Sequence, residues 1–233
     1  MTMNCVLLKM GGAGTRCEQG MPKQFVDICG KPLFVHVLNM YTKVECIDSF
    51  VVVTNPDYIE YTYQEANKIL GKKLLGVVAG GKTNPRSTYN GLIYASKHLN
   101  DDDILLVHDV TDPIICAEAI EKCIKSAKIY GCAAVITEQV HTLYLKDENG
   151  FITSTIAKQT VGSGYSPEAF KMHIIKDCFS NALNEDLDNM TSAISIAIAN
   201  GVKAHTVISH QLDLKITYKE DIESFGLIIN KLN

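Results

Sequence analysis

The sequence contains no apolar run long enough to span a membrane, and its first residues lack the apolar core of a signal peptide. With a formal net charge of −4 at pH 7, the chain offers no basic field to nucleic acid or to an anionic membrane surface. Its eight cysteines are scattered, without the Cys-x-x-Cys pair of a zinc site or a redox motif. These absences predict a cytoplasmic protein that binds neither nucleic acid nor membrane.

The sequence also has no internal repeat, no low-complexity tract and no linker rich in Pro, Gly and Ser. It has neither a nucleophilic serine elbow nor a His-x-x-x-His pair, so its histidines are expected to be structural. At 233 residues, of which 46% are hydrophobic, the chain is long enough for one sizeable domain. We therefore expect a single domain over residues 1–233.

Short apolar runs alternate with amphipathic stretches along most of the chain. The runs predict strands at 5–8, 50–54, 75–79, 104–107, 133–137 and 204–208. The amphipathic stretches predict helices at 33–44, 58–70, 86–99, 117–130, 173–184, 190–199 and from about 219. This alternation predicts a Rossmann-like α/β fold, with a mostly parallel sheet covered by helices on both faces. Ligands of such sheets bind beyond the carboxyl ends of the strands.

Between residues 141 and 160 the pattern changes. Two alternating segments, 142–145 and 151–155, are joined by a turn signal at 147–150, which predicts a protruding β-hairpin. The hairpin has too little apolar surface to be stable alone. From its residues alone it is a surface flap.

A glycine-rich turn with two cations follows the first predicted strand. Gly11, Gly12 and Gly14 have no side chains, so backbone N–H groups can approach an anion closely. Arg16 and Lys23 add positive charge to the same loop, which suits a polyphosphate. The alternative is an ordinary strand-to-helix turn with exposed basic residues.

Better-known glycine loops fit this segment only in part. No Gly-Lys-Ser/Thr follows the glycines, so the segment is not a Walker A loop. Cys17 stands where a dinucleotide-binding loop has its third glycine. Pro22 stiffens the chain before Lys23, which favours a lysine that is aimed at a ligand.

A second glycine turn, Gly80-Gly81, leads into the predicted helix that contains Ser87. Two glycines expose backbone amides and carbonyls that can contact the flat edge of a base, and Ser87 adds a hydroxyl at the start of the helix. A capped helix after a turn is a sufficient alternative explanation.

Asp109 lies at the tip of the predicted strand at 104–107. A carboxylate in this position is a common metal ligand, because the sheet holds it rigidly over the ligand crevice. The alternative is that Asp109 caps the following helix. Asp213 offers a second oxygen ligand, and Mg²⁺ needs only one or two protein carboxylates when phosphate and water supply the rest.

Three segments together resemble a known family. Gly12-x-Gly14-x-Arg16, then Pro-Lys-Gln-Phe at 22–25 and Gly-Lys-Pro-Leu-Phe-Val-His at 30–36, resemble the opening of the polyol-phosphate cytidylyltransferases. This family includes the enzymes for 2-C-methyl-D-erythritol 4-phosphate and for ribitol 5-phosphate. The motif sequences in this chain resemble those of the ribitol enzyme more closely. The resemblance covers nearly the whole chain and is weakest at 159–164.

The resemblance implies a role for each motif. The catalytic residues are expected to be Arg16, Lys23 and Lys215, with Lys23 nearest the α-phosphate of CTP. The nucleotide-binding residues are expected to be Met10, Gly11, Gly12, Ala13, Gly14, Thr15, Gly80, Gly81 and Ser87. Asp109 and Asp213 are expected to hold the Mg²⁺ that bridges the triphosphate and the acceptor. The family normally has an arginine where Asn84 stands, and whether Arg86 substitutes for it is left open.

The acceptor side is implied in the same way. The expected acceptor-binding residues are Asp112, Thr142, Lys158 and Ser166. Lys158 aligns with an arginine of the family and keeps its charge without the bidentate fork. In the family a β-arm embraces the partner subunit and contributes to its active site, so 141–160 is expected to be a dimerisation arm of a homodimer.

One departure bears on the acceptor. The family's His-Asp-Ala-x-Arg-Pro reads His-Asp-Val-Thr-Asp-Pro at 108–113, so Asp112 replaces an arginine. A carboxylate beside an anionic acceptor is repulsive unless the acceptor carries a cationic or hydroxyl-rich group. This predicts an acceptor other than methylerythritol phosphate, either a different polyol or an amine-bearing alcohol. The alternative is that Asp112 points away from the site.

The expected reaction is transfer of CMP from CTP to a phosphorylated alcohol such as ribitol 5-phosphate, giving a CDP-alcohol and pyrophosphate for surface polysaccharide synthesis. One alternative is a 2-C-methyl-D-erythritol 4-phosphate cytidylyltransferase of isoprenoid synthesis. The other is a nucleotide-binding regulatory protein without catalysis. Retention of Arg16, Lys23, Asp109, Asp213 and Lys215 argues against the regulatory alternative.

Overall fold

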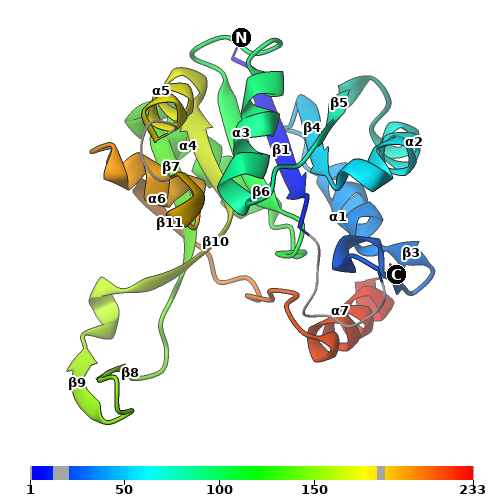
Figure 1. Ribbon diagram of the computed structural model, residues 1–233. Helices are drawn as coiled ribbons and strands as arrows, with labels where there is room; N and C mark the ends of the chain where they lie inside the picture. Colours follow the sequence, from blue (N-terminus) through cyan, green and yellow to red (C-terminus); the bar gives the residue numbers. More distant parts are fainter. Residues whose placement is uncertain (1, 13–20, 183–186, 233) are drawn as a thin grey trace.

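The computed structural model of the protein describes residues 2–12, 21–182 and 187–232 (Figure 1). A seven-stranded sheet forms its centre, with the strand order β11-β7-β10-β6-β1-β4-β5. These strands are β1 (Asn4–Met10), β4 (Ser49–Thr54), β5 (Leu74–Ala79), β6 (Ile104–Asp109), β7 (Cys132–Glu138), β10 (Gly162–Lys171) and β11 (His205–Ile208). β1 pairs in parallel with β4 and β6, as do β4 with β5 and β7 with β11. The predicted, mostly parallel sheet is confirmed.

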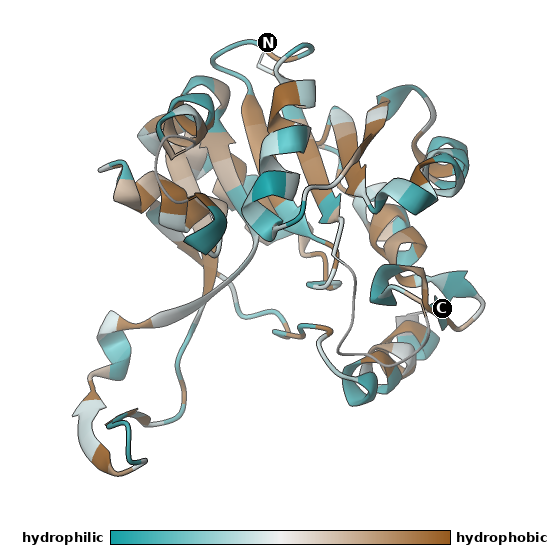
Figure 2. Cartoon of the chain, in the orientation of Figure 1, coloured by the Kyte–Doolittle hydropathy of each residue, from teal (hydrophilic) through white to brown (hydrophobic). Residues whose placement is uncertain are grey.

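Helices lie on both faces of this sheet. They are α1 (Leu33–Tyr41), α2 (Ile59–Leu70), α3 (Asn84–Ala95), α4 (Ala117–Tyr130), α5 (Met172–Ala182), α6 (Ala193–Ala199) and α7 (Lys219–Leu232). The side chains of β1 alternate between two cores: Leu8 packs in the core that includes α1 and α4, and Leu7 in the core that includes α3, α5 and α6. In Figure 2 the hydrophobic colour gathers on the central strands. The sheet is therefore buried on both faces, as a parallel sheet requires.

The sequence does not predict β10, which runs antiparallel between β6 and β7. Its first six residues include Gly162, Gly164 and Pro167, residue types that disfavour strands. The pairing with β7 is irregular between Tyr165 and Glu168, and the peptide bond before Pro167 is cis. The second half contains Phe170, which is fully buried. Tertiary packing, rather than local propensity, makes this segment a strand.

Several helix ends differ from the prediction. α3 begins two residues early, because the Thr83 side chain caps it by accepting from the Arg86 N–H. α6 begins at Ala193 rather than at 190, because Ser192 and Ser195 form a capping box. α1 and α3 end three and four residues early, at Tyr41 and Ala95, and turns follow them. The predicted end of α5 at 184 lies outside the described residues.

Two small hairpins complete the chain. β2 (Asp27–Ile28) and β3 (Lys31–Pro32) form one, and β8 (Leu143–Lys146) and β9 (Ile152–Ile156) form the predicted arm. Figure 1 shows the arm extending away from the body of the molecule, beyond the ends of β7 and β10. The protruding hairpin is confirmed as a structural feature. Among the described residues, no helix has both the length and the apolar character needed to cross a membrane.

Gly91 lies where α3 approaches β1 and β4 closely. A Cβ atom at this position would clash with Leu7 Cδ1 and lie 2.6 Å from Val53 Cγ2. The clash should cost about 1–3 kcal/mol against a gain of ~1 kcal/mol that alanine brings to a helix, so we expect Gly91→Ala to lower the free energy of unfolding by up to about 2 kcal/mol.

Urea denaturation measures this effect, with Gly226→Ala in α7 as the matched control. A Cβ at Gly226 would meet no atom closer than 3.6 Å, so this variant should keep or slightly raise the stability. A Gly91→Ala protein as stable as the Gly226→Ala control would contradict the packing described here.

Candidate active site

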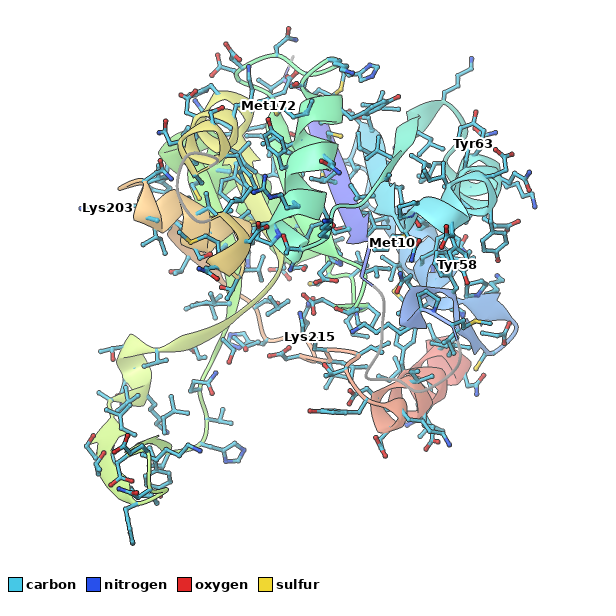
Figure 3. All side chains as sticks on the ribbon, in the orientation of Figure 1. Met10, Tyr58, Tyr63, Met172, Lys203 and Lys215 are labelled. Atoms are coloured by element: carbon cyan, nitrogen blue, oxygen red, sulfur yellow. The ribbon has the colours of Figure 1, made fainter. Side chains whose placement is uncertain are left out.

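A cavity of about 870 Å³ opens at the carboxyl ends of β1, β4, β5 and β6. Its walls come from the residues that follow these strands, from the start of α3, and from segments around Lys23 and Lys215. Figure 3 shows Lys215 on the segment before α7, beyond the end of β1 that carries Met10. This edge of the sheet is where the alternation of strands and helices predicts a ligand.

The two glycine turns meet in this cavity. A Cβ on Gly80 would lie 3.1 Å from the Gly11 Cα atom and 3.1 Å from Ser87 Oγ, and a Cβ on Gly11 would lie 3.1 Å from Ser87 Oγ, so these two positions leave little room for a side chain. The Ser87 hydroxyl accepts from the Gly81 N–H at 3.0 Å and donates to the Thr83 carbonyl at 3.0 Å. Met10, Gly11, Gly12, Gly80, Gly81 and Ser87 all line the cavity. The structure thus brings the described nucleotide-binding candidates together.

Gln24 holds the first glycine turn in place. Its amide Nε2 donates to the carbonyl oxygens of Met10 at 2.6 Å and Gly12 at 2.8 Å. The side chain is buried, so these hydrogen bonds are shielded from water. From the sequence alone, Gln24 is part of the Pro-Lys-Gln-Phe motif and has no predicted role. Ala13, Gly14, Thr15 and Arg16 lie outside the described residues.

Lys23 reaches the cavity from a short 3-10 helix, Lys23–Phe25, that follows Pro22. Pro22 has extended backbone angles, φ −61° and ψ 135°, which direct the chain into this turn. The Lys23 ammonium donates to the Ile216 carbonyl at 2.7 Å, which joins the glycine-loop side of the cavity to the segment that carries Lys215. Lys23 is therefore held in place at the cavity wall, and its orientation toward a ligand stays a prediction.

Asp109 ends β6 and lines the cavity. Its Oδ1 accepts from the Thr111 N–H at 3.2 Å and the Thr111 hydroxyl at 2.9 Å. Burial by itself would raise the pKa of the Asp109 carboxyl, but the charges of Lys9 and Lys215 and the Thr111 hydrogen bonds lower this pKa below its ordinary value. The carboxylate is therefore ionised at neutral pH, as a metal ligand must be.

Asp112 requires a correction. It is only 7% exposed, does not line the cavity, and has both carboxylate oxygens paired. Oδ2 accepts from the Ser166 N–H at 3.1 Å and the Ser166 hydroxyl at 2.7 Å, and Oδ1 accepts from Lys215 Nζ at 2.9 Å. The expectation of an uncompensated carboxylate facing the acceptor is not supported. Instead, Asp112 ties Lys215 to the irregular part of β10.

The charge of Lys215 is secured by the same arrangement. Burial acts to lower the pKa of the Lys215 ammonium, but the carboxylates of Asp112 and Asp109 raise this pKa above its ordinary value. Lys215 therefore carries a full positive charge at the cavity wall at neutral pH. Ser166 also accepts from the Asp109 N–H at 2.9 Å. In this chain Ser166 thus supports Asp109 and Asp112 and lies outside the cavity lining.

The predicted pair of metal carboxylates is not assembled. Asp213 is exposed, is absent from the cavity lining, and accepts from the Thr137 hydroxyl at 3.3 Å. Within the described residues, no three His, Cys, Asp or Glu side chains gather as a metal site. Asp213 lies in an irregular segment, where no strand or helix periodicity indicates the direction of a side chain. Asp109 remains the described carboxylate at the cavity.

The arm candidates also lie away from the cavity of their own chain. Thr142 is exposed beside β8, and Lys158 is exposed in a 3-10 turn, Lys158–Thr160, between β9 and β10. Neither lines the cavity. Their role in acceptor binding stays a prediction that needs a second copy of the chain.

Several polar residues of the cavity lining were not predicted from the sequence, namely Lys9, Asn55, Lys82, Thr83, Thr111, Thr191 and Thr217. Lys9 ends an otherwise apolar strand directly before the glycine turn, and this single charge was the available signal. The sequence left open whether Arg86 substitutes for the arginine that the family has at position 84. Arg86 does not line the cavity and pairs with Asp188, with Nε 3.1 Å from Oδ1. Asn84 does line it.

Solved structures that match this fold include cytidylyltransferases of one kind. The chain matches 4-diphosphocytidyl-2C-methyl-D-erythritol synthase from Anaerococcus prevotii with a TM-score of 0.83 and 20% identity, over 98% of this chain and 96% of that one. It matches 2-C-methyl-D-erythritol 4-phosphate cytidylyltransferase from Thermus thermophilus with a TM-score of 0.74 and 18% identity, over 99% and 100% of the two chains. These likenesses establish the fold.

Sequence comparisons establish the family. The family model "IspD: 2-C-methyl-D-erythritol 4-phosphate cytidylyltransferase" matches residues 4–231. The enzyme of this name from Thermosipho africanus is 32% identical over 221 residues, 95% of this chain and 96% of its own length. That from Clostridium botulinum, strain Loch Maree, is 31% identical over 232 residues, all of both chains. The chain therefore belongs to the 2-C-methyl-D-erythritol 4-phosphate cytidylyltransferase family.

Proposed function

We propose that the protein transfers CMP from CTP to 2-C-methyl-D-erythritol 4-phosphate and releases pyrophosphate. The observation that carries the proposal is the cavity in which two glycine turns, Asp109, Lys23 and Lys215 converge. Backbone donors and fixed cations suit a triphosphate, and a second anionic substrate has room beside them. The names of the relatives supply the nucleotide and the acceptor.

The reaction needs no covalent intermediate with the protein. An oxygen of the acceptor phosphate attacks the α-phosphorus of CTP in line and forms a new P–O bond. The bond from the α-phosphorus to the oxygen that bridges it to the β-phosphate breaks, and pyrophosphate leaves with the electron pair. Because the nucleophile is already an anion, the protein contributes chiefly positioning and charge neutralisation.

The lysines have distinct tasks in this scheme. Lys23 neutralises the charge that develops on the α-phosphate, and Lys215 holds the acceptor phosphate. Asp112 keeps Lys215 directed at the cavity through their 2.9 Å ion pair. The two glycine turns hold the nucleotide, with the base against Gly81 and the start of α3. Lys23 and Lys215 are joined through the chain at Ile216, so the two substrates meet at one place.

One residue of the cavity, Asp109, has the chemistry of a Mg²⁺ ligand. Asp109 is an ionised carboxylate on a rigid strand end, and Mg²⁺ typically takes one or two protein carboxylates and completes its shell with phosphate and water. When bound, the ion would neutralise phosphate charge and align the two reactants. Asp213 would have to turn toward the cavity to join it.

The proposed acceptor differs from the one the sequence suggested. The case for an amine-bearing acceptor or another polyol depended on an unpaired Asp112, and this carboxylate is paired with Lys215 and Ser166. The curated relatives carry the methylerythritol phosphate name, which favours that acceptor over ribitol 5-phosphate and lends no support to polysaccharide synthesis.

A competition experiment tests the acceptor. The protein is incubated with CTP, Mg²⁺ and equal concentrations of 2-C-methyl-D-erythritol 4-phosphate, ribitol 5-phosphate and phosphoethanolamine, and the CDP products are quantified by mass spectrometry. The methylerythritol product should dominate. A dominant ribitol or ethanolamine product would overturn the acceptor assignment while leaving cytidylyl transfer intact.

We also propose that the protein acts as a homodimer. The arm exposes large apolar side chains, among them Phe151 at 71% and Ile152 at 65%, which a second copy would bury. In such a dimer Thr142 and Lys158 of one protomer would reach the cavity of the other. Light scattering of the purified chain tests this, and a monomer at the concentrations used for activity would contradict it.

A further inference from the structure

Lys9 is a buried cation for which the proposed mechanism has no task. It lies at the carboxyl end of β1, is only 8% exposed, and lines the cavity. The residues before it on the strand, Leu7 and Leu8, are fully buried and apolar. Because an ammonium group is costly to withdraw from water unless it is paired, a lysine in this position requires anionic or polar partners.

The hydrogen-bond partners of Lys9 in the structure use only part of the donor capacity of its ammonium group. Lys9 Nζ donates to Asn84 Oδ1 at 2.7 Å, and an ammonium has three N–H donors. Within the described part of the chain, Asn84 is the hydrogen-bond acceptor that the structure gives it. Two donors are therefore available to a ligand in the cavity.

Lys9 lies near two carboxylates at the edge of the sheet where the cavity opens. In the parallel pairing of β1 with β6, Lys9 lies opposite Asp109, and neighbouring strands are about 4.8 Å apart. Although burial acts to raise the pKa values of Asp109 and of Glu168 on β10, the charge of Lys9 opposes this effect on both. Lys9 thus offsets carboxylate charge that would otherwise repel a phosphate at this edge of the sheet.

We infer that Lys9 is a further substrate-binding residue, whose ammonium donates to a phosphate oxygen of the nucleotide while Asn84 holds its side chain in place. The inference rests on the proposed function, since the triphosphate of CTP is the anion concerned. It adds a cation from β1 itself to those from the flanking segments.

The position of Asn84 assigns Lys9 to the nucleotide rather than to the acceptor. Asn84 opens α3, between Gly81 and Ser87, in the turn that packs against Gly11. The acceptor side is organised separately, around Lys215 and its partner Asp112. A loss of Lys9 should therefore affect CTP and leave the acceptor largely untouched.

Calorimetric titration with CTP and steady-state kinetics with the acceptor test this. For Lys9→Met, the Kd for CTP should rise about 10- to 100-fold, the cost of one hydrogen bond to a charged group. The KM for the acceptor should stay within about twofold. Lys9→Arg, which keeps the charge, should recover most of the CTP affinity, a rescue that a purely packing role would not produce.

Lys73→Met is the matched control. The Lys73 ammonium donates to the Ile47 carbonyl at the same distance, 2.7 Å, but lies before β5, at the opposite end of the sheet. This variant loses the same charge and should bind CTP as the wild type does. A Lys9→Met protein with wild-type CTP affinity, or an equal loss in Lys73→Met, would overturn the inference.

A second variant covers the case of misfolding, and the inference and the proposed function can fail separately. Should Lys9→Met fail to fold, Asn84→Ala carries the test: it leaves Lys9 without its acceptor and should weaken CTP binding about threefold or more, and unchanged binding would overturn the inference. If the wild-type protein binds no CTP, the proposed function fails and the inference fails with it. Normal CTP binding by both wild type and Lys9→Met defeats the inference alone.

Discussion

Replacing Lys23 with alanine is expected to lower the rate constant of pyrophosphate release by about 100- to 1000-fold, while CTP binding weakens far less. Lys23 is fixed at the cavity by Pro22 on one side and by its 2.7 Å hydrogen bond to the Ile216 carbonyl on the other. A cation held in this way can stabilise charge that appears on the α-phosphate only in the transition state. The variant is measured by a coupled pyrophosphate assay and by CTP titration.

Lys31→Ala is the control for this variant. Lys31 is an exposed lysine of the β2–β3 hairpin, a few residues along the chain and outside the cavity lining. Its loss should leave turnover and CTP binding unchanged. If Lys23→Ala lost CTP affinity and turnover to the same extent, Lys23 would bind ground state and transition state alike, and its catalytic role would be contradicted.

Asp112→Asn is expected to lower kcat/KM for the acceptor by about 10- to 100-fold, because a charge-assisted hydrogen bond to Lys215 is lost. An amide oxygen in the place of Oδ2 still accepts from Ser166, but the amide NH₂ then faces the Lys215 ammonium. Two donors repel, so Lys215 leaves its present position. The Kd for CTP should change little.

The control for Asp112→Asn is Asp102→Asn. Asp102 also pairs with a lysine, Lys171, at 3.5 Å, but its side chain is 75% exposed, and such a surface pair contributes little. Acceptor kinetics should therefore stay at the wild-type level in Asp102→Asn. Wild-type acceptor kinetics in Asp112→Asn, or a loss confined to CTP, would contradict the assignment of Lys215 to the acceptor side.

The alternation of apolar and amphipathic segments was sufficient to predict the fold, and the glycine turns were sufficient to predict the cavity. β10 was not predictable in this way, because Gly162, Gly164 and Pro167 are typical of loops. Its strand conformation depends on β6 and β7, which lie on either side of it in the sheet and far from it in sequence. Such pairings leave no local signal.

Site residues with a local sequence signal were predictable, and those that depend on distant partners were not. Asp109 and Lys23 could be placed at the cavity from the sequence because a strand end and a proline limit where their side chains lie. The partner of Asp112 could not be foreseen, since Lys215 is about a hundred residues away and arrives on an irregular segment. Without that lysine, Asp112 appeared to be an unpaired charge and suggested the wrong argument about the acceptor. Lys9 was missed because a single lysine after an apolar strand is no motif.

The most direct test of the account is pyrophosphate release by the wild-type protein with CTP, Mg²⁺ and 2-C-methyl-D-erythritol 4-phosphate, compared with the same mixture lacking either substrate. Release is expected only when both substrates are present, with one CDP-alcohol formed for each pyrophosphate. Tight CTP binding without pyrophosphate release would contradict it and favour a regulatory role for the cavity.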